Sequence, residues 1–324
     1  MKVLGIESTA HTLGIGIVDE DEVLANAKSM YTPEEGGIHP RKAAEHLYQH
    51  ASEKLNEALD RAGIEEEELD GIAFSQGPGI PQCLDVGAVL ARSLSNRLEV
   101  PLTGVNHCIA HITVGERTTG AEDPTTLYVS GGNSQIIEYR KGRYRVVGET
   151  LDIALGNALD KFARKLGYPH PGGPEIEKLA AETEEILELS YPIKGMDFSF
   201  SGIATEAERK IGDVDDEVLA NSFQEYAFAV TVEALERAMA QENSSQALLT
   251  GGVAMNSRLR EMVEQMCGQR GAEAFFPPKE YCMDNGAMIA HQGLLQLKEG
   301  VETSIEDSGK KPDWRPDQVD VGWR

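Results

Sequence analysis

The chain has 324 residues, of which 40% are hydrophobic and 33 are glycine, a composition typical of an α/β protein with room for two domains. It contains no run of eighteen apolar residues, which excludes a membrane-spanning helix, and its first apolar run ends at an acid, which argues against a signal peptide. The 54 acidic residues outnumber the 30 basic ones, and the net charge of −24 argues against ordinary nucleic-acid binding.

The acidic excess and the cysteines bear on where the chain works. Proteins that function in very high salt carry acid-rich surfaces, because the salt screens their self-repulsion to a few ångströms. Three stretches have the pattern of such solvated acidic faces: residues 65–68, 182–188 and 213–217. We favour a halophilic cytoplasm over an acidic mesophilic protein, in which case the charge says little about the substrate. The four cysteines lack Cys-x-x-Cys spacing, which indicates free thiols in a cytosolic chain.

The first part of the chain reads as strands separated by helices. Apolar runs between turn residues predict strands over residues 2–7, 13–18, 23–27, 71–75 and 102–105. Helical spacing of apolar residues predicts helices over residues 41–62 and 86–98, and Gly63 is expected to end the first of them. The loop Gly77-Pro78-Gly79 separates the fourth strand from the second helix.

The pattern then restarts. Three strands are expected over residues 126–130, 134–139 and 144–148, and a strand over 247–250 leads through a glycine turn into a helix over 256–267. A last helix is expected over residues 287–297. The repeat predicts two similar lobes whose glycine turns face one cleft: an N-terminal lobe over residues 1–123 and a C-terminal lobe over 124–324. The last helix is a candidate to return to the first lobe.

Two histidines four residues apart form the most informative pair in the sequence. If the stretch that contains His107 and His111 is helical, both side chains lie on one helix face and can bind one transition metal. The spacing is similar to the zincin motif, but Cys108 stands where a metallopeptidase has its catalytic glutamate. The alternative is a pair of ordinary histidines on an apolar helix.

A series of short motifs resembles a known superfamily. Residues 5–9, 130–133 and 250–253 are similar to the two phosphate loops and the adenosine loop of actin-like, sugar-kinase-like and Hsp70-like (ASKHA) ATPases. More narrowly, the chain resembles the archaeal catalytic subunit of the KEOPS complex, whose bacterial relative is TsaD. The matching stretches keep the order of that family, and they are Gly-Ile-Glu-Ser-Thr-Ala-His-Thr-Leu-Gly (5–14), Gly-Gly-Ile-His-Pro (36–40), Phe-Ser-Gln-Gly-Pro-Gly (74–79), Gly-Val-Asn-His-Cys-Ile-Ala-His (104–111), Tyr-Val-Ser-Gly-Gly-Asn (128–133), Pro-Gly-Gly-Pro (171–174), Phe-Ser-Phe-Ser-Gly (198–202) and Asp-Asn-Gly-Ala-Met-Ile-Ala (284–290).

The resemblance implies a fold and an activity. The fold is a two-lobed α/β ASKHA fold with duplicated RNase H-like domains. The activity is transfer of a threonylcarbamoyl group from threonylcarbamoyl-adenylate to the N6 amine of the tRNA adenosine 3′ of the anticodon. The donor is a mixed anhydride with AMP as a good leaving group, so the enzyme mainly positions the acyl carbon and stabilises developing charge.

The resemblance also implies the metal ligands. His107 and His111 would bind Fe(II), which we favour, or Zn(II), with Asp284 as a third ligand and Tyr128 as a further one. The alternative for Asp284 is a cap of the following helix, a common place for Asp. Glu7 stands where many ASKHA ATPases have a catalytic acid, and it is a candidate base or a group that supports a ligand.

The expected donor-binding residues lie in the C-terminal lobe. The resemblance implies that the strand end and turn bind the phosphate and carbamoyl groups, that two acids bind ribose hydroxyls, and that a glycine and an asparagine border the nucleoside. From the residues alone, the turn is more simply a β-turn, the acids are surface acids, and the asparagine is a helix cap. The residues in question are Tyr128, Val129, Ser130, Gly131, Gly132, Asn133, Asp160, Gly173, Glu177 and Asn256.

The implied partners are tRNA of the ANN-decoding set and other KEOPS subunits. These are a kinase-like ATPase of the Bud type, a dimerising subunit of the Pcc type and a tRNA-tail-binding subunit of the Cgi type, all in the cytoplasm and away from membranes. Such partners would supply the basic tRNA surface that this chain lacks. The stretch Ile80-Pro81-Gln82-Cys83-Leu84-Asp85 departs from the family pattern. The resemblance implies that some archaeal members continue into a fused protein kinase, which we do not expect in this chain.

Three other functions compete with the transferase. A metallopeptidase would explain the histidine pair, but it needs a glutamate base and has no use for phosphate loops. An ASKHA-type ATPase or sugar kinase shares the expected fold without explaining the histidines. A nucleotide-holding scaffold inside a complex would need no chemistry at all.

Overall fold

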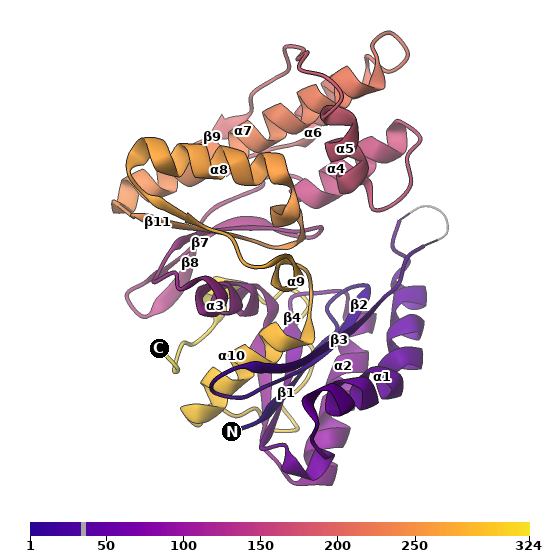
Figure 1. Cartoon of the computed structure of the whole chain (residues 1–324), viewed down its shortest axis with the longest axis vertical. Coiled ribbons are helices and arrows are strands. Elements are labelled where there is room, and N and C mark those ends of the chain that lie inside the picture. Colours follow the sequence, from indigo (N-terminus) through magenta and orange to yellow (C-terminus); the bar gives the residue numbers. More distant parts are fainter. Residues whose placement is uncertain (34–36) are drawn as a thin grey trace. The chain divides into compact units, whose positions relative to one another are not determined.

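The computed structural model describes residues 1–33 and 37–324, which form two compact units (Figure 1). Unit 1 consists of Met1–Arg117, Lys141–Tyr144 and Met283–Arg324, and unit 2 consists of Thr118–Arg140 and Arg145–Cys282. Gly36, the first residue of the expected motif over residues 36–40, lies outside the described residues. The lobe boundary expected between residues 123 and 124 stays a prediction.

Unit 1 is built on a five-stranded sheet with the order β3-β2-β1-β4-β5. Its strands are β1 (Val3–Glu7), β2 (Thr12–Val18), β3 (Val23–Met30), β4 (Gly71–Gly77) and β5 (Leu102–Asn106). β2 is antiparallel to both β1 and β3, whereas β4 is parallel to both β1 and β5. Because β1, β4 and β5 run the same way, their carboxyl ends meet at one edge of the sheet.

Two long helices cover one face of this sheet. α1 (Pro40–Ala62) packs on β2 and β3, and α2 (Pro81–Leu98) packs on β4. The predicted helix end at Gly63 is confirmed, since that residue takes the left-handed conformation with φ of 66°. α2 begins five residues before the expected position 86. Proline is well placed in the first turn of a helix because its missing N–H would have no intrahelical partner there.

The opposite face of the sheet carries α10 (Gly286–Lys298). Adjacent residues of a strand point to opposite faces, and in β1 Ile6 lies toward Gly87 of α2 whereas Gly5 lies toward α10. A Cβ atom on Gly5 would come within 2.1 Å of the Ala290 nitrogen, and one on Gly14 within 2.5 Å of the Gly286 nitrogen. Glycines therefore let the helix backbone lie directly on the strands, and this contact fixes the position of the residues just before α10.

Unit 2 repeats the strand order of unit 1. Its sheet has the order β12-β11-β6-β7-β8 and is formed by β6 (Thr125–Val129), β7 (Ser134–Arg140), β8 (Arg143–Glu149), β11 (Gln246–Thr250) and β12 (Glu273–Phe275). β6 and β7 are antiparallel, and β11 is parallel to both β6 and β12. The duplicated three-stranded opening followed by parallel strands is confirmed, and with it the expected two-sheet α/β fold.

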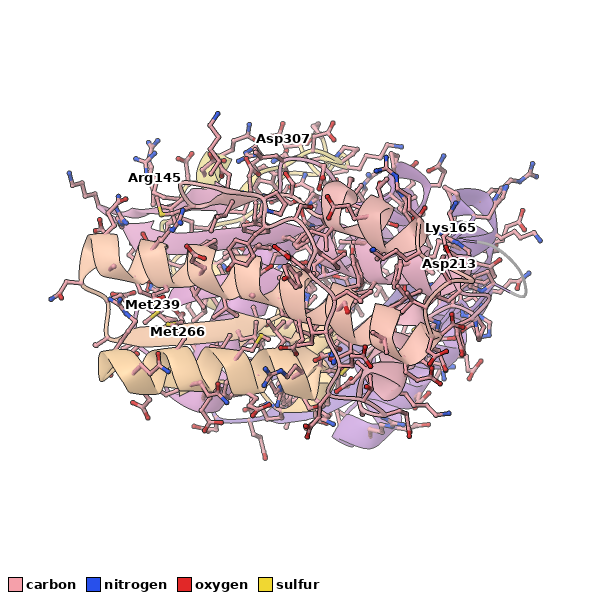
Figure 2. All side chains as sticks on the ribbon, turned by 90° about the horizontal axis from the view of Figure 1, so that it is seen from above. Arg145, Lys165, Asp213, Met239, Met266 and Asp307 are labelled. Carbon is pink, nitrogen blue, oxygen red and sulfur yellow. The ribbon has the colours of Figure 1, made fainter. Side chains whose placement is uncertain are left out.

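The helices of unit 2 enclose an apolar core. They are α4 (Leu155–Lys165), α5 (Gly172–Ala180), α6 (Ser201–Glu208), α7 (Asp216–Glu242), α8 (Ser257–Arg270) and α9 (Lys279–Cys282), with a short hairpin of β9 (Ile193–Lys194) and β10 (Asp197–Phe198). Phe162 and Phe223 pack with ring centroids 4.6 Å apart. Met239 of α7 and Met266 of α8, labelled in Figure 2, belong to the same buried cluster. Across the described ranges, none of the helices is both long and apolar enough to cross a membrane.

Candidate functional site

The carboxyl edge of the unit 1 sheet gathers residues from four segments far apart in the sequence. β1 ends at Glu7, and β5 ends at Asn106 directly before α3 (His107–Thr119). The predicted helical setting of the histidine pair is therefore confirmed. Asp284 stands just before α10, which the glycine contacts hold against β1 and β2. The fold thus brings these side chains together although about 280 residues separate the first from the last.

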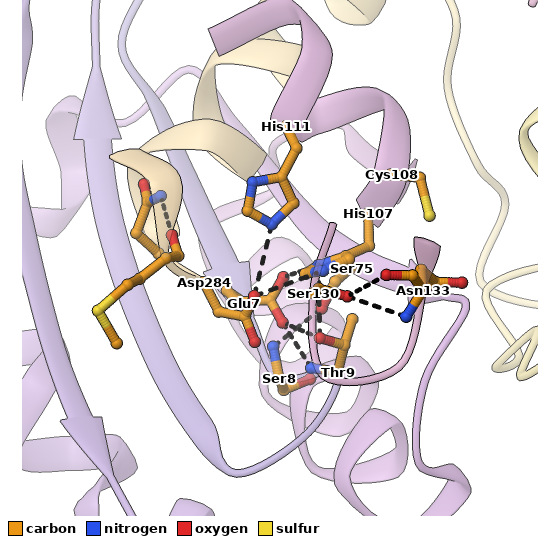
Figure 3. Close-up of polar contacts among 12 residues, drawn as sticks. Glu7, Ser8, Thr9, Ser75, His107, Cys108, His111, Ser130, Asn133 and Asp284 are labelled. Atoms are coloured by element: carbon orange, nitrogen blue, oxygen red, sulfur yellow. Dashed lines mark hydrogen bonds and ion pairs between the residues drawn. The ribbon is translucent and has the colours of Figure 1, made fainter. Parts of the chain in front are cut away.

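Two imidazoles and one carboxylate converge in a largely buried cluster (Figure 3). One ligand atom from each of His107, His111 and Asp284 lies within 4.8 Å of the other two. Oδ1 of Asp284 is 3.5 Å from Nε2 of His107 and 3.4 Å from Nε2 of His111. Both Nε2 atoms therefore face the carboxylate. The centroids of the two rings are 4.8 Å apart and the ring planes are nearly perpendicular, at 84°.

Asp284 does not cap the helix that follows it. Oδ1 of Asn285 accepts the Met288 N–H at 3.0 Å, so the neighbouring asparagine is the cap of α10. The helix-cap alternative for Asp284 is therefore wrong, and its carboxylate faces the histidines instead. Burial alone would raise the pKa of Asp284, but the His107 charge and the contact with His111 hold that pKa well below its usual range.

Glu7 contacts the Nδ1 side of the His107 ring, opposite the nitrogen that faces Asp284. Its Oε2 lies 2.9 Å from Nδ1 of His107, and its Oε1 accepts the Thr9 N–H at 2.6 Å and the Thr9 hydroxyl. Burial lowers the pKa of His107, but the charges of Glu7 and Asp284 outweigh it and raise the pKa to about 9. Since Nδ1 faces Glu7, the ring presents Nε2 to His111 and Asp284, the arrangement seen when a carboxylate orients a metal-binding histidine.

The surroundings of His111 shift its pKa in the opposite direction from that of His107. Burial lowers the pKa of His111, and His107 lowers it further, although Asp284 acts in the opposite sense. The ring is therefore held in its neutral form, which is the form that binds metals. Two imidazole nitrogens and one carboxylate oxygen, close together in a largely buried cluster, fit a divalent transition metal such as iron or zinc.

Three residues that the sequence analysis did not single out belong to this cluster. Thr9 holds Glu7, Asn106 caps α3, and the charge of His11 helps to lower the pKa of Asp284. All three residues lie inside the motif stretches over residues 5–14 and 104–111, which is the sequence signal that could have indicated them. Tyr128 belongs to unit 2, where it is buried in β6, and its expected role as a metal ligand stays a prediction.

The turn between β6 and β7 is closed by its own hydrogen bonds. The Ser130 N–H donates to the Asn133 carbonyl at 2.7 Å, and the Asn133 N–H donates to the Ser130 hydroxyl at 3.0 Å. A Cβ atom added to Gly131 or Gly132 would meet nothing within 4 Å, so the space over this turn is open. The second glycine turn is adjacent, since a Cβ atom on Gly251 would lie 2.3 Å from the Val129 carbonyl oxygen.

The two acids expected at the ribose have partners within the protein. Oδ1 of Asp160 accepts the Gly172 N–H at 2.7 Å, and Oδ2 lies 3.4 Å from Nδ1 of His170. Burial raises the pKa of Asp160, but His170 and this N–H together lower it more. Glu177 accepts the Ser257 N–H at 2.8 Å. Their predicted role in ribose binding stays a prediction.

Asn256 and Gly173 complete the set. Oδ1 of Asn256 accepts the Leu259 N–H at 3.1 Å, so Asn256 is the cap of α8, as its simpler alternative predicted. Its Nδ2 donates to Oε1 of Gln224 at 3.0 Å. A Cβ atom on Gly173 would approach only the end of Leu159, at 4.0 Å, which leaves this helix start open.

The sequence of the chain is similar to that of a known protein family. Residues 22–291 match the family model described as TsaD: tRNA N6-adenosine threonylcarbamoyltransferase. The chain is 53% identical to the protein of that name from Methanothrix thermoacetophila, with 100% of both chains covered. It is also 53% identical to a probable bifunctional tRNA threonylcarbamoyladenosine biosynthesis protein from Methanosarcina mazei, of which it spans 59%.

Solved structures show the same fold at low sequence identity. Thermococcus kodakarensis HypF superposes with a TM-score of 0.66 at 15% identity, over 92% of this chain and 48% of that one. A ROK hexokinase from Thermus thermophilus superposes with a TM-score of 0.51 at 18% identity, over 93% of this chain and 100% of that one. These likenesses concern the fold alone.

Proposed function

Since this chain belongs to the tRNA N6-adenosine threonylcarbamoyltransferase family, we propose that it transfers the threonylcarbamoyl group of threonylcarbamoyl-adenylate to tRNA. The acceptor is the N6 amine of the adenosine 3′ of the anticodon. That nitrogen attacks the carbamoyl carbon, the bond from this carbon to the phosphate oxygen breaks, AMP leaves, and the amine gives up one proton. The observation that carries the proposal is the match to a transferase of this family over the whole chain.

In this proposal His107, His111 and Asp284 hold one divalent metal, Fe(II) in preference to Zn(II). One support is their convergence in a largely buried cluster. The other is that Asn285, and not Asp284, caps α10, so the Asp284 carboxylate faces the histidines. When bound, the metal would supply positive charge that orients the threonyl part of the donor and polarises it.

Glu7 acts as a positioning residue rather than as a base. Its two oxygens are already engaged, Oε2 by His107 and Oε1 by Thr9, and the side chain is fully buried. A general base must reach the proton that it removes, whereas this carboxylate reaches the imidazole. Of the two roles expected for Glu7, its contacts therefore support the one that holds a ligand.

The donor's adenylate is assigned to unit 2. The support is the open space over Gly131 and Gly132 and the adjacent turn at Gly251, because glycine turns let backbone N–H groups approach a phosphate. The remaining residues proposed for this part of the donor are Tyr128, Val129, Ser130, Asn133, Asp160, Gly173, Glu177 and Asn256.

The metallopeptidase alternative receives no support from these contacts. Peptide hydrolysis at such a metal needs a carboxylate free to activate water, and Cys108 occupies the place of that glutamate. The nearby acids are committed elsewhere, Glu7 to His107 and Asp284 to both histidines.

We also propose that the chain works in the cytoplasm as the catalytic subunit of a KEOPS complex. The net charge of −24 supports the involvement of partners, because tRNA binding draws on lysine and arginine side chains that this chain has in short supply. The kinase-like, dimerising and tRNA-tail-binding subunits would supply that surface. The same acidity supports a halophilic source.

The transfer itself can be tested with preformed donor. Purified chain, the partner subunits, an ANN-decoding tRNA and synthetic threonylcarbamoyl-adenylate are combined, and digested tRNA is analysed by mass spectrometry for threonylcarbamoyladenosine. We expect product with the complete set and a large loss when His107→Ala replaces the wild-type chain. If a known family member gives product in the same assay and this chain gives none, the transferase proposal is wrong.

A further inference from the structure

The helix that carries the histidine pair begins at a well-defined cap. Asn106 is the last residue of β5 and the residue before α3, and it is 2% exposed. Its Oδ1 accepts the N–H groups of Cys108 at 3.1 Å and of Ile109 at 3.3 Å, the second and third residues of the helix. This is the pattern of an N-cap, so Asn106 fixes the first turn of α3, in which His107 is the first residue.

The other end of the same amide is bound to a distant part of the chain. Nδ2 of Asn106 donates to the carbonyl oxygen of Trp314 at 2.9 Å. The orientation of the amide follows from its partners, because Oδ1 faces two donors and Nδ2 faces an acceptor. The side chain therefore connects α3 with the C-terminal segment over residues 301–324, which we call the strap.

The strap is fastened along the edge of the sheet before it reaches Asn106. The Thr303 N–H donates to the Leu102 carbonyl at 2.7 Å, and the Thr303 hydroxyl accepts the Gly104 N–H at 2.9 Å. The strap thereby pairs with β5, the edge strand of the unit 1 sheet, whose backbone groups would otherwise face solvent.

A second set of contacts fastens the strap to the end of β4. Nε2 of Gln76 donates to the carbonyl oxygens of Asp307 at 2.8 Å and Gly309 at 2.7 Å, and the Gln76 carbonyl accepts the Lys311 N–H at 2.7 Å. These three bonds lie within seven residues of Trp314. They set where its carbonyl oxygen stands relative to Asn106.

We propose that Asn106 is a positioning residue that couples the docked strap to the metal-binding helix, so that fastening of the strap sets the affinity of the His107–His111 pair for its metal. The inference rests on the proposed metal site. A metal site of this kind needs its ligand atoms placed to within about 0.5 Å, and a cap held at both ends of its side chain restrains the first turn more than a cap alone. Neither Asn106 nor the strap needs to touch the metal.

The test is a double-mutant cycle on Zn(II) affinity, measured by competition with a chromophoric chelator on the full-length chain. Asn106→Ala removes both the cap and the link to Trp314, and Gln76→Ala loosens the strap and leaves Asn106 in place. We expect Asn106→Ala to weaken zinc binding about tenfold, which corresponds to the loss of roughly one helix cap, and Gln76→Ala to weaken it by less, because Asn106 still caps α3 in that variant. Because both changes act through one link, the double variant should bind zinc at most about twofold more weakly than Asn106→Ala alone.

Two controls separate positioning from general loss of stability. Asn106→Ser restores an N-cap without a new charge but is too short to reach Trp314, so its zinc affinity should fall between those of wild type and Asn106→Ala. Ser222→Ala removes a buried hydroxyl in unit 2 that accepts the Leu187 N–H, and it should lower the melting temperature without changing zinc affinity.

Several outcomes would overturn the proposal. Multiplicative losses in the double variant would show that the strap and the cap act independently. An unchanged zinc affinity in Asn106→Ala, while wild type binds one zinc, would show that the cap does not position the ligands and would leave the metal site intact. A wild-type chain that binds no zinc or iron would instead overturn the metal site and this inference together.

Discussion

Nδ1 of His107 lies 2.9 Å from Oε2 of Glu7, and this contact determines which nitrogen of the imidazole faces His111 and Asp284. The two residues are 100 positions apart in the sequence and meet only because β1 and β5 end at the same edge of a partly parallel sheet. A buried carboxylate on Nδ1 raises the basicity of the ring and leaves Nε2 available as a ligand. The metal site therefore depends on the topology of unit 1 as much as on the ligands.

Removal of any one of the three ligands is predicted to abolish stoichiometric metal binding. His107→Ala, His111→Ala and Asp284→Asn each leave the α10 cap in place, since that cap is Asn285. The variants should stay folded by circular dichroism and contain well below one metal per chain by elemental analysis. Retention of a full equivalent of metal in the double histidine variant would exclude these side chains as ligands.

Glu7→Gln is predicted to weaken metal binding by roughly 10–100-fold, the usual effect of losing a carboxylate that supports a ligand. Gln keeps the size of the side chain but removes the charge that faces Nδ1 of His107. Calorimetric titration with Zn(II) gives the affinity. The matched control is Glu68→Gln, an exposed acid of unit 1 paired with Lys2, which should bind zinc like wild type.

Gly286→Ala is predicted to displace α10 and with it Asp284. The new methyl carbon would come within 2.1 Å of the Gly16 nitrogen, so the helix must move off the sheet. Overpacking of this kind costs about 1–3 kcal/mol of stability, and metal content should fall in parallel. In Gly268→Ala, where the methyl meets nothing within 4 Å, the helix should instead become more stable by roughly 0.5–1 kcal/mol. Urea unfolding of both variants measures the contrast, and a stable, metal-replete Gly286→Ala would contradict it.

The stability of unit 1 is predicted to fall in acid partly through His291. Burial lowers the pKa of this buried residue of α10 to about 3, and Arg117, whose Nη1 lies 2.9 Å from Nδ1, adds to the shift. The unfolded chain therefore binds more protons than the folded one between about pH 3 and the ordinary histidine pKa of 6.5. Stability rises with pH across this window and is lost as pH falls through it.

His291→Gln removes that dependence, because glutamine does not titrate. The advantage of wild type over His291→Gln in unfolding free energy should shrink by roughly 1 kcal/mol for each pH unit below 6.5. Urea unfolding at pH 7 and near pH 5 measures the difference. An advantage that stays constant over this range would show that His291 is not protonated on unfolding.

The chain is predicted to be more stable in molar KCl than at about 0.1 M, where the Debye length is roughly 10 Å and repulsion among its acids remains. The reason is the excess of 54 acidic over 30 basic residues. Thermal unfolding in both salts gives the two midpoints. Identical midpoints would remove the argument for a halophilic source.

The sequence predicted the metal-binding residues better than the residues that hold them in place. The spacing of His107 and His111 placed both on one face of a helix, and the structure confirms this because the helical period depends only on local geometry. Asp284 remained ambiguous, since Asp and Asn are both good caps and stand side by side. Only the three-dimensional contact of Asn285 with Met288 shows which of the two caps the start of the helix.

Long-range contacts explain what the sequence could not predict. The partnership of Glu7 with His107 and the link of Asn106 to Trp314 depend on strand order, which apolar periodicity does not determine. The early start of α2 at Pro81 was missed because a proline after a glycine loop is as typical of a turn as of a first helical residue.

The most direct test of the central claim is anomalous scattering from crystals of the chain purified with its native metal. Data recorded on both sides of the iron and zinc absorption edges identify the element and its position. One peak is expected, at about 2.0–2.2 Å from Nε2 of His107, Nε2 of His111 and a carboxylate oxygen of Asp284. The absence of any peak at these three side chains, in protein that transfers threonylcarbamoyl to tRNA, would contradict the central claim.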